Sequence, residues 1–393
     1  LYNENGISGF WNDMNEPAMF KVDRCTFPDA VLHDYEGEMT DHRKAHNIYG
    51  LQMSRATVEG LQELNPDKRP FLVTRATYSG GQRFAAVWTG DNVASWEHLH
   101  IANTQCQRLS VSGFSFVGSD IGGFAGTPTG ELMLRWVQLG IFHPFYRIHS
   151  IGNNVDGASE TSQDEVAEQE KLNRLDQEPW VFGADYEALM KEAIELRYQL
   201  LPYIYSTFWQ NVTYGTPVIR SLVFYDQTDT KNYEQESEFL FGDHLLVCPV
   251  EHPSTIEGFI KQEEEEEENT ENSSENTSEG ETLASNLIDE KIIEEEGNIL
   301  EKEENIEEPI TEQLIYLPKG DWYDFYTAEK YEGKQEITLA VELSKIPIFV
   351  KAGSVVPFYP TQQYVGEKDI KQVKLRAFYI NGMRESSFYE DAG

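Results

Sequence analysis

Two aspartates stand where paired acid–base chemistry could take place. Asp13 follows the apolar run GISGFW, Asp91 follows FAAVW, and each has a tryptophan shortly before it. Cleavage of a glycosidic bond uses two carboxyl groups, one to attack the anomeric carbon and one to protonate the leaving oxygen; in the retaining route they lie roughly 5–5.5 Å apart. Aspartates at strand ends also cap the helices that follow. The residues alone therefore leave a catalytic and a structural interpretation open.

The elements that must bring these aspartates together read as alternating strands and helices. Five short apolar runs end in polar or glycine-rich residues, at Asp13, near Ser79, and at Asp91, Asp120 and His149. Most are separated by segments with helical spacing of apolar residues, at 41–64, 95–110 and 127–140, although little room for a helix lies between the second and third runs. This alternation predicts a parallel sheet that fits the second half of a (β/α)8 barrel. Active sites in that fold lie where the strands end.

The texture changes in the C-terminal half of the chain. Residues 186–212 predict a long helix interrupted at Pro202, and later segments are short runs rich in Val, Ile, Tyr and Phe with glycine and proline turns. We therefore predict an α/β fold: the C-terminal part of a barrel followed by all-β (β-sandwich) domains. The expected domains are the barrel at 1–213, a proximal β-sandwich at 214–358 and the start of a distal β-domain at 359–393.

Two polar stretches interrupt this pattern. Residues 261–312 hold 21 Asp and Glu against 3 Lys, so they account for −18 of the formal net charge of −37. A self-repelling acidic tract buries too little surface to fold alone, and we interpret 262–312 as a disordered insert, with an acidic docking element as the alternative. Residues 152–178 are also polar and predict an exposed loop.

Composition argues against several classes of function. The acidic balance would repel phosphates, which disfavours nucleic acid as a partner. The sequence contains no run of 18 or more apolar residues, so we expect no transmembrane helix. The cysteines are odd in number and far apart, which predicts neither a disulfide framework nor a zinc site: Cys25, Cys106 and Cys248. Because the chain begins with Leu1 in what reads as the middle of a domain, we interpret it as a fragment or a processed chain.

Four motifs in order resemble glycoside hydrolase family 31: GFWNDMNEP, RATYSGGQRFAAVWTGDN, GSDIGGF and FHPFYRIHS. The WNDMNEP form is similar to that of the family's α-glucosidases, including bacterial enzymes and glucosidase II. The resemblance covers most of the chain outside 152–178 and 262–312. It implies retaining, exo-acting hydrolases built on a (β/α)8 barrel with β-sandwich domains before and after it. The N-terminal sandwich and early barrel strands of such a protein are missing here, so we expect this chain alone not to complete a sugar pocket.

The resemblance also implies roles for individual residues. Asp13 matches the catalytic nucleophile, and Asp91 matches the general acid/base. Arg83 matches an arginine that helps to bind the terminal sugar near the acid/base, with a structural ion pair as the alternative. Asp120 and His149 match residues that hydrogen-bond hydroxyls of that sugar.

Further residues of the same motifs match the walls of the sugar pocket, although aromatic core packing is the alternative for the rings: Trp11, Met14, Trp88 and Phe124. We expect Glu16 to orient the nucleophile loop without acting in catalysis.

The resemblance implies a retaining exo-acting α-glucosidase that releases glucose from the nonreducing ends of oligosaccharides such as maltose-like α-glucosides. An α-glucosyltransferase or an α-xylosidase of the same family is the enzymatic alternative, although xylosidases of the family carry a Lys-Thr-Asp-Phe-Gly-Glu type of nucleophile stretch that is absent here. A silent glycan-binding homologue is the non-enzymatic alternative. No cofactor and no metal are implied. The compartment is left open among cytoplasm, which is slightly favoured, periplasm, secretion and the endoplasmic reticulum lumen.

Overall fold

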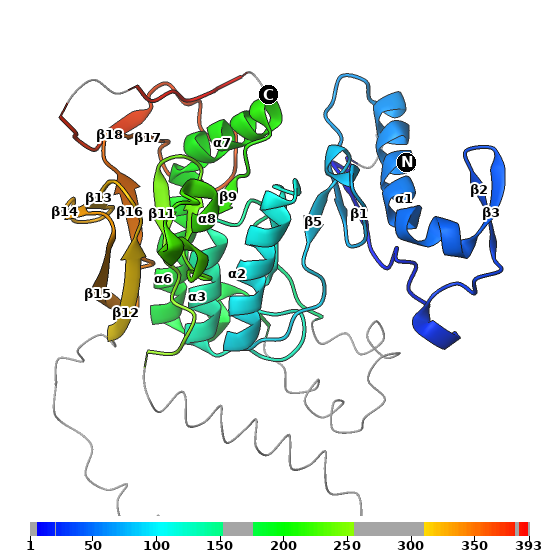
Figure 1. Cartoon of the computed structure of the whole chain (residues 1–393), viewed down its shortest axis with the longest axis horizontal. Coiled ribbons are helices and arrows are strands. Elements are labelled where there is room, and N and C mark those ends of the chain that lie inside the picture. The colour runs from blue at the N-terminus through cyan, green and yellow to red at the C-terminus, as the bar shows by residue number, and fades with distance from the viewer. Residues whose placement is uncertain (1–5, 20, 152–175, 255–309, 382–384, 392–393) are drawn as a thin grey trace, which may run out of the picture.

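The structure is a computed structural model that describes residues 6–19, 21–151, 176–254, 310–381 and 385–391 (Figure 1). Two predicted segments lie largely outside the described residues: the acidic insert, as far as residue 309, and the exposed loop, between residues 152 and 175.

The N-terminal half is built on parallel strands. One sheet has the order β1 (Phe10–Asn12), β4 (Leu72–Thr74), β5 (Ala86–Trp88) and β6 (Val117–Gly118), and each neighbouring pair is parallel. After Ser119 the chain continues as β7 (Asp120–Ile121), which pairs in parallel with β8 (Arg147–Ile148). The strands lie where the five apolar runs predicted them, and their parallel pairing confirms the α/β prediction for this half.

The connecting helices lie where the sequence predicted them, and each begins at a side-chain cap. The helix α1 (His42–Leu64) is capped by Asp41, α2 (Trp96–Val111) by Ser95, and α3 (Gly130–Gly140) by Thr129, each through a side-chain oxygen that accepts a backbone N–H bond. Between β4 and β5 there is only a short 3-10 turn, η2 (Gly81–Arg83). A hairpin of β2 (Leu32–Tyr35) and β3 (Glu38–Asp41), preceded by the turn η1 (Asp23–Cys25), was not predicted.

The long helix predicted at 186–212 is two helices, α6 (Ala184–Gln199) and α7 (Leu201–Tyr214), which follow the turn η3 (Pro179–Phe182). Pro202 lies in the first turn of α7, where its missing N–H would have no helical partner. The predicted interruption at Pro202 is therefore confirmed, and its cause is the start of a second helix.

The C-terminal half is antiparallel, as predicted. Its largest sheet has the order β14 (Lys330–Glu332), β13 (Asp321–Asp324), β16 (Ile348–Lys351), β11 (Leu245–Val247), β10 (Phe239–Phe241) and β9 (Ile219–Ser221). Two strand pairs accompany it, β12 (Ile310–Leu317) with β15 (Gln335–Glu342), and β17 (Val355–Phe358) with β18 (Lys374–Ala377). The short helix α8 (Leu222–Tyr225) and the turn η4 (Thr230–Tyr233) follow β9.

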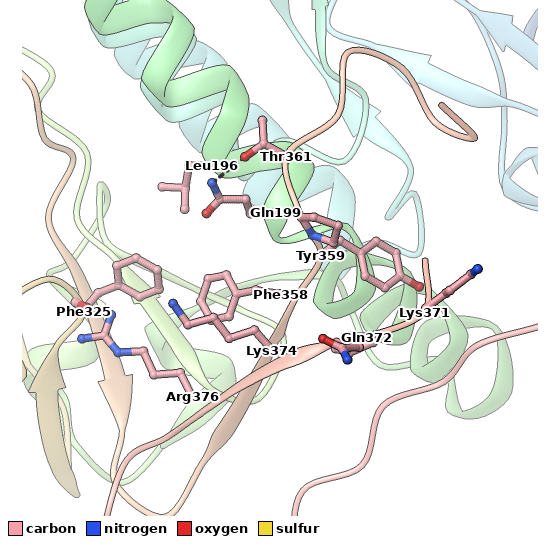
Figure 2. Close-up of a pocket in the computed structure, with 12 residues that line it drawn as sticks. Leu196, Gln199, Phe325, Phe358, Tyr359, Thr361, Lys371, Gln372, Lys374 and Arg376 are labelled. Atoms are coloured by element: carbon pink, nitrogen blue, oxygen red, sulfur yellow. Dashed lines mark hydrogen bonds between the residues drawn. The ribbon is translucent and has the colours of Figure 1, made fainter. Parts of the chain in front are cut away.

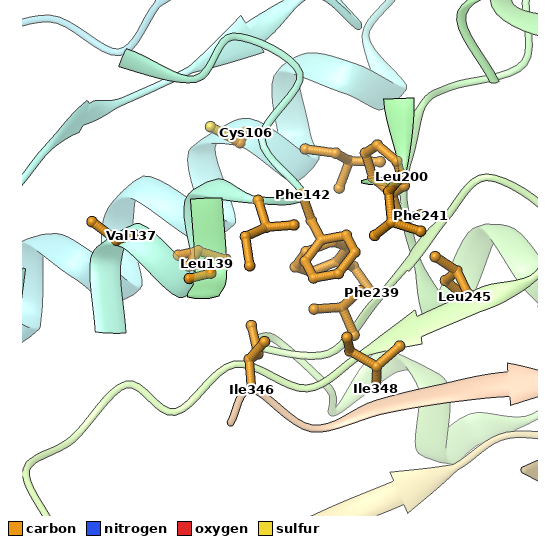
Figure 3. Packing of buried hydrophobic residues seen from close by; sticks show 14 of the residues in the cluster. Cys106, Val137, Leu139, Phe142, Leu200, Phe239, Phe241, Leu245, Ile346 and Ile348 are labelled. Carbon is orange, nitrogen blue, oxygen red and sulfur yellow. The ribbon is translucent and has the colours of Figure 1, made fainter. Parts of the chain in front are cut away.

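One hydrophobic core joins the two halves. Phe142, at the end of α3, meets Phe239 and Phe241 of the antiparallel sheet, and Ile348 of β16 belongs to the same cluster (Figure 3). The helix α3 is buried from Leu132 to Gly140, and its two polar side chains there, Arg135 and Gln138, bond to each other and to backbone carbonyl oxygens of Leu343 and Lys345. The antiparallel sheet of the β-domain therefore packs against the helices of the barrel domain and shares their hydrophobic core.

Three further features bear on function. Among the described helices, none is both long and apolar enough to cross a membrane. The three cysteines form no disulfide, and Cys106 and Cys248 are buried. In the described part of the chain, no group of three His, Cys, Asp or Glu side chains is arranged to hold a metal ion.

Candidate active site

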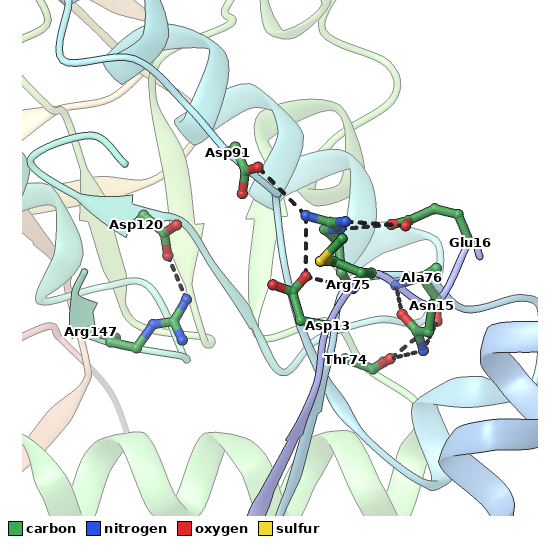
Figure 4. A network of polar contacts seen from close by, with 10 residues as sticks. Asp13, Asn15, Glu16, Thr74, Arg75, Ala76, Asp91, Asp120 and Arg147 are labelled. Carbon is green, nitrogen blue, oxygen red and sulfur yellow. Dashed lines mark hydrogen bonds and ion pairs between the residues drawn. The ribbon is translucent and has the colours of Figure 1, made fainter. Parts of the chain in front are cut away.

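The two aspartates singled out by the sequence lie close together, at the ends of two parallel strands that flank β4 in one sheet (Figure 4). Asp13 follows β1, and Asp91 comes three residues after β5. Nη1 of Arg75 lies 3.1 Å from Oδ1 of Asp13 and 3.5 Å from Oδ2 of Asp91. The sum of the 3.1 Å and 3.5 Å contacts, about 6.6 Å, is therefore an upper limit for the separation of these carboxylate oxygens.

Arg75 stands at the centre of this cluster. It follows β4, and its Nε and Nη2 atoms donate to the two carboxylate oxygens of Glu16 at 2.7 Å and 3.2 Å. This forked pairing fixes the plane of the guanidinium and leaves Nη1 to face Asp13 and Asp91. Glu16 thus orients the arginine that separates the two aspartates, which refines the expectation that Glu16 orients the nucleophile loop.

The electrostatics of the cluster raise the pKa of Asp91. Burial raises the pKa of Asp91, the charges of Asp13 and Glu16 raise it further, and Arg75 opposes them, with a net upward shift. Oδ1 of Asp13, by contrast, accepts from the backbone N–H of Met14 at 2.7 Å as well as facing Arg75. The pKa of Asp91 is thus raised, while Oδ1 of Asp13 is held by two donors.

Asp120 forms a second, deeper ion pair. Its side chain is 0% exposed, and its Oδ1 accepts from Nη2 of Arg147 at 2.6 Å. Burial raises the pKa of Asp120 to about 6, although Arg147 lowers it. The other oxygen, Oδ2, has no hydrogen-bond partner among the described residues. The guanidinium of Arg147 in turn lies over the rings of Trp11 and Trp88, at 5.2 Å and 5.5 Å.

Aromatic rings line the approach to these charges. The ring of Trp11 meets His149 edge-on at 5.1 Å, and Phe124 stacks on His149 at 5.6 Å. Burial and the neighbouring Arg147 lower the pKa of His149 to about 4, so its imidazole is neutral at pH 7 and can both donate and accept a hydrogen bond. Such rings beside neutral polar groups suit the C–H faces and hydroxyls of a sugar.

Met14 and Trp88 differ in how they reach the site. Met14 is exposed and has a φ of 56°, a left-handed conformation that turns the chain sharply after Asp13. Trp88 is only 3% exposed and meets Trp11 edge-on at 5.6 Å. The role of Trp88 as a pocket wall stays a prediction, and its burial against Trp11 is what the alternative of aromatic core packing would give.

The expectation for Arg83 needs correction. Its Nε donates to the carbonyl oxygen of Gly80 at 3.0 Å, and its guanidinium lies over the Phe84 ring at 5.0 Å. The arginine beside the acidic pair is Arg75, eight residues earlier in the same motif. Arg83 belongs to the short turn η2, which folds back on itself, whereas Arg75 directly follows the buried strand β4.

Sequence reasoning also missed Arg147, although it lies two residues before His149 in the motif FHPFYRIHS. A signal for both arginines was present, because each lies at or beside the end of an apolar run that predicted a barrel strand. Side chains at that end of parallel strands face one common mouth.

The loop of Asp91 is fastened to the loop of Asp120. Asn92 donates from Nδ2 to the carbonyl oxygen of Asp120 at 3.2 Å and accepts at Oδ1 from the N–H of Phe124 at 3.0 Å. Gly123 has a φ of 88°, and a Cβ there would lie 2.4 Å from the backbone nitrogen of Ala94. Only glycine allows this approach, which keeps the acid near the second ion pair.

Comparison with known proteins gives a consistent result. A family model described as the glycosyl hydrolases family 31 TIM-barrel domain matches residues 1–207, and the family 31 C-terminal domain matches 215–263 and 302–356. Alpha-glucosidase 2 of Bacillus thermoamyloliquefaciens is 36% identical over 356 residues, which cover 91% of this chain and 36% of that protein. The chain thus spans about a third of the length of this curated relative.

Solved structures show the same likeness. A GH31 dextranase of Flavobacterium johnsoniae, complexed with glucose, superposes with a TM-score of 0.72 and 28% identity, covering 96% of this chain and 38% of the dextranase. The catalytic subunit of endoplasmic reticulum glucosidase II, solved with the binding domain of its regulatory subunit, gives a TM-score of 0.67 and 28% identity, covering 89% of this chain and 30% of that one.

Proposed function

The chain belongs to glycoside hydrolase family 31, and on this premise we propose that the protein is a retaining, exo-acting α-glucosidase. It removes terminal α-linked glucose from the nonreducing ends of oligosaccharides by double displacement. Asp13 is the nucleophile and Asp91 the general acid/base. The relatives that support α-glucose as the sugar are named α-glucosidases.

The observation that carries the proposal is the shared contact of Asp13 and Asp91 with Nη1 of Arg75. The distance between Oδ1 of Asp13 and Oδ2 of Asp91 therefore cannot exceed about 6.6 Å, the sum of the 3.1 Å and 3.5 Å contacts. Retaining glycosidases hold their two carboxyl groups roughly 5–5.5 Å apart, whereas inverting enzymes need roughly 6.5–9.5 Å to admit a water molecule. The limit falls at the lower edge of the inverting range, so it favours direct attack by Asp13.

The contacts around each group fit its step. Because Oδ1 of Asp13 is held by Met14 and Arg75, we assign the attack on the anomeric carbon to Oδ2. As that bond forms, the bond from the anomeric carbon to the leaving oxygen breaks, and Asp91 gives its proton to that oxygen. The ionised Asp91 then takes a proton from water, which attacks the anomeric carbon and releases Asp13.

The remaining side chains bind the sugar and hold it between the two acids. Arg147 and the neutral His149 offer hydrogen-bond donors to its hydroxyls, and the exposed Trp11 offers a ring face. Asp120 keeps Arg147 in place through their ion pair.

The test is the anomeric form of the first product. The full-length protein that contains this chain is given p-nitrophenyl α-glucoside, and the proton NMR signals of the released glucose are followed before mutarotation. We expect α-glucose to appear first. Release of β-glucose first would contradict the retaining route, and no release of glucose from this substrate, maltose, isomaltose or nigerose would contradict the α-glucosidase itself.

A further inference from the structure

We infer that Asn15 is a positioning residue: its buried side-chain amide binds the Thr74 hydroxyl and the Ala76 backbone, on either side of Arg75, and so fixes the guanidinium between Asp13 and Asp91. The inference rests on the proposed function, because it assigns a role within the same site. In this proposal Asn15 does not contact the sugar; it acts through Arg75.

The contacts of Asn15 form a clamp between two strand ends (Figure 4). Its side chain is buried, with the residue 2% exposed. Nδ2 donates to Oγ1 of Thr74 at 2.8 Å and to the carbonyl oxygen of Ala76 at 3.3 Å, and Oδ1 accepts from the N–H of Ala76 at 3.0 Å. The residues directly before and after Arg75 are therefore both bound to one amide.

Surrounding contacts make the clamp stiff. Oγ1 of Thr74 also donates to the carbonyl oxygen of Ala76 at 3.1 Å, and the N–H of Arg75 donates to the carbonyl oxygen of Asn12 at 3.2 Å. A Cβ on Gly50 would lie 2.3 Å from the Ala76 carbonyl oxygen, so α1 packs directly against the clamped peptide. Any shift of Ala76 must therefore displace a helix as well as break hydrogen bonds.

The loop that carries Asn15 also carries the carboxylates that Arg75 binds. Asp13 lies two residues before Asn15, and Glu16 comes directly after it. The amide thus sets the distance between the acidic loop after β1 and the cationic loop after β4. Because the guanidinium lies between the two catalytic carboxyl groups, an error in this distance moves it relative to both.

The clamp requires a group that donates and accepts at the same time. The asparagine amide supplies a donor toward Thr74 and Ala76 and an acceptor toward the Ala76 N–H. An ionised carboxylate of the same shape keeps the acceptor but turns a second oxygen toward the Ala76 carbonyl, which is repulsive. A protonated carboxyl can donate there again. At a position this buried, desolvation raises the pKa of a carboxyl group, so mild acid should restore the donor.

The experiment compares Asn15→Asp and Asn15→Ala with the wild-type protein on p-nitrophenyl α-glucoside at pH 5 and pH 7.5. For Asn15→Asp we expect kcat to fall about 100-fold at pH 7.5, with a smaller change in KM, because misplacement by about 1 Å can cost that much. Relative to wild type at the same pH, we expect this loss to shrink about 10-fold at pH 5. Asn15→Ala should remain low at both pH values.

Asn12 provides the matched control. It lies in the same segment, is 7% exposed, and its Nδ2 donates to Oγ1 of Thr57 on α1 at 3.0 Å instead of to the Arg75 loop. Asn12→Asp should therefore lower thermal stability to a similar extent, yet keep kcat within about 5-fold of wild type at both pH values. Equal, pH-independent losses of kcat in Asn12→Asp and Asn15→Asp would overturn the inference, because they would reveal only a common folding defect.

A milder variant covers the case in which Asn15→Asp does not fold. Thr74→Val removes the hydroxyl of the clamp, and with it one bond to the Ala76 carbonyl oxygen, while leaving both bonds between Asn15 and Ala76. We expect about a 5–10-fold loss of kcat and a shift of the alkaline limb of kcat/KM to higher pH, since a displaced Arg75 lowers the pKa of Asp91 less. An unchanged rate and pH profile would contradict the inference. A wild-type protein that turns over no glucoside would instead contradict the proposed function.

Discussion

Two aspartate–arginine pairs, one at the barrel mouth and one in the β-domain, have opposite electrostatics. Asp120 is 0% exposed, and burial raises its pKa to about 6 despite its bond to Arg147. The side chain of Asp243 is 46% exposed and pairs with Arg220. Burial alone would raise the pKa of Asp243, but the hydrogen bond and charge of Arg220 lower it overall.

Neighbouring charges explain much of the difference. Asp91 and Asp13 lie near Asp120 and disfavour its ionisation, whereas His244 lies near Asp243 and favours it. At the mouth the carboxyl group is buried and the cation is partly exposed; in the β-domain the cation is buried and the carboxylate reaches water. The mouth therefore holds charges that titrate near neutral pH, and the β-domain holds a pair that stays ionised and supports the fold.

The largest effect on activity is expected at the barrel mouth, when the proposed nucleophile Asp13 is removed. We expect Asp13→Ala to lower kcat by about 10⁴-fold or more, because the covalent step is lost. Its thermal midpoint should stay within about 4 °C of wild type, because a partly exposed carboxylate near other carboxylates contributes little to stability. Turnover on p-nitrophenyl α-glucoside and thermal unfolding measure the two effects. A folded Asp13→Ala protein with near-normal turnover would remove Asp13 from the mechanism.

A second test concerns the pH dependence of the mouth. As pH falls through about 6, Asp120 becomes protonated and its ion pair with Arg147 is lost, so kcat/KM should fall with it. Asp120→Asn should lower kcat/KM about 100-fold at neutral pH and should lack this limb. A pH–rate profile from pH 4.5 to 8 measures both, and an unchanged limb near pH 6 in the variant would assign it to another group.

Ionisation of Asp120 should raise activity but lower the stability of the fold. Because the pKa of Asp120 is raised in the folded state above its usual 3.8, ionisation favours the unfolded chain, and stability is lost as pH rises from about 4 through 6. Thermal unfolding at pH 4.5 and pH 7 should show that Asp120→Asn lacks this component of the pH dependence.

The smallest effect on rate is expected in the β-domain. Asp243→Asn leaves the buried Arg220 without its anion, and we expect it to lower the free energy of unfolding by about 1–3 kcal/mol, less than for a fully buried pair because Asp243 is half exposed. Turnover should stay within about 2-fold. Because the pKa of Asp243 is lowered in the folded state, its contribution is present above about pH 4 and lost below it. Urea unfolding at pH 7 and pH 3.5 should show the difference from wild type narrowing, and a constant difference would contradict it.

Much of the local structure followed from the sequence. Apolar runs that end in polar residues predicted the parallel strands, Ser95 predicted the start of α2, and Pro202 predicted the break between α6 and α7. The hairpin at 32–41 was missed, because LHDYEGEMTD shows little of the apolar alternation that marks a strand. Its two strands are joined by backbone pairing, which does not require a particular pattern of side chains.

The sequence singled out the acids and missed two of the cations beside them. Asp13 and Asp91 stood out as carboxyl groups at the ends of apolar runs, and the resemblance to the family implied roles for them and for Asp120. The choice between Arg75 and Arg83 could not be made in the same way, because both lie in one motif and either could reach a carboxylate.

What the sequence determined by itself is the parallel strands, the positions of the connecting helices and the chemical groups at the strand ends, since these depend on neighbours along the chain. What only the tertiary structure decided is which cation stands between the acids, that Trp88 packs edge-on against Trp11, and that Asn15 binds the peptide next to Arg75. Most of those contacts join residues 59 or more positions apart in the chain, although Arg75 and Asp91 are only 16 apart. Their energies depend on distance, burial and the direction of each hydrogen bond, which appear only once the strands lie side by side.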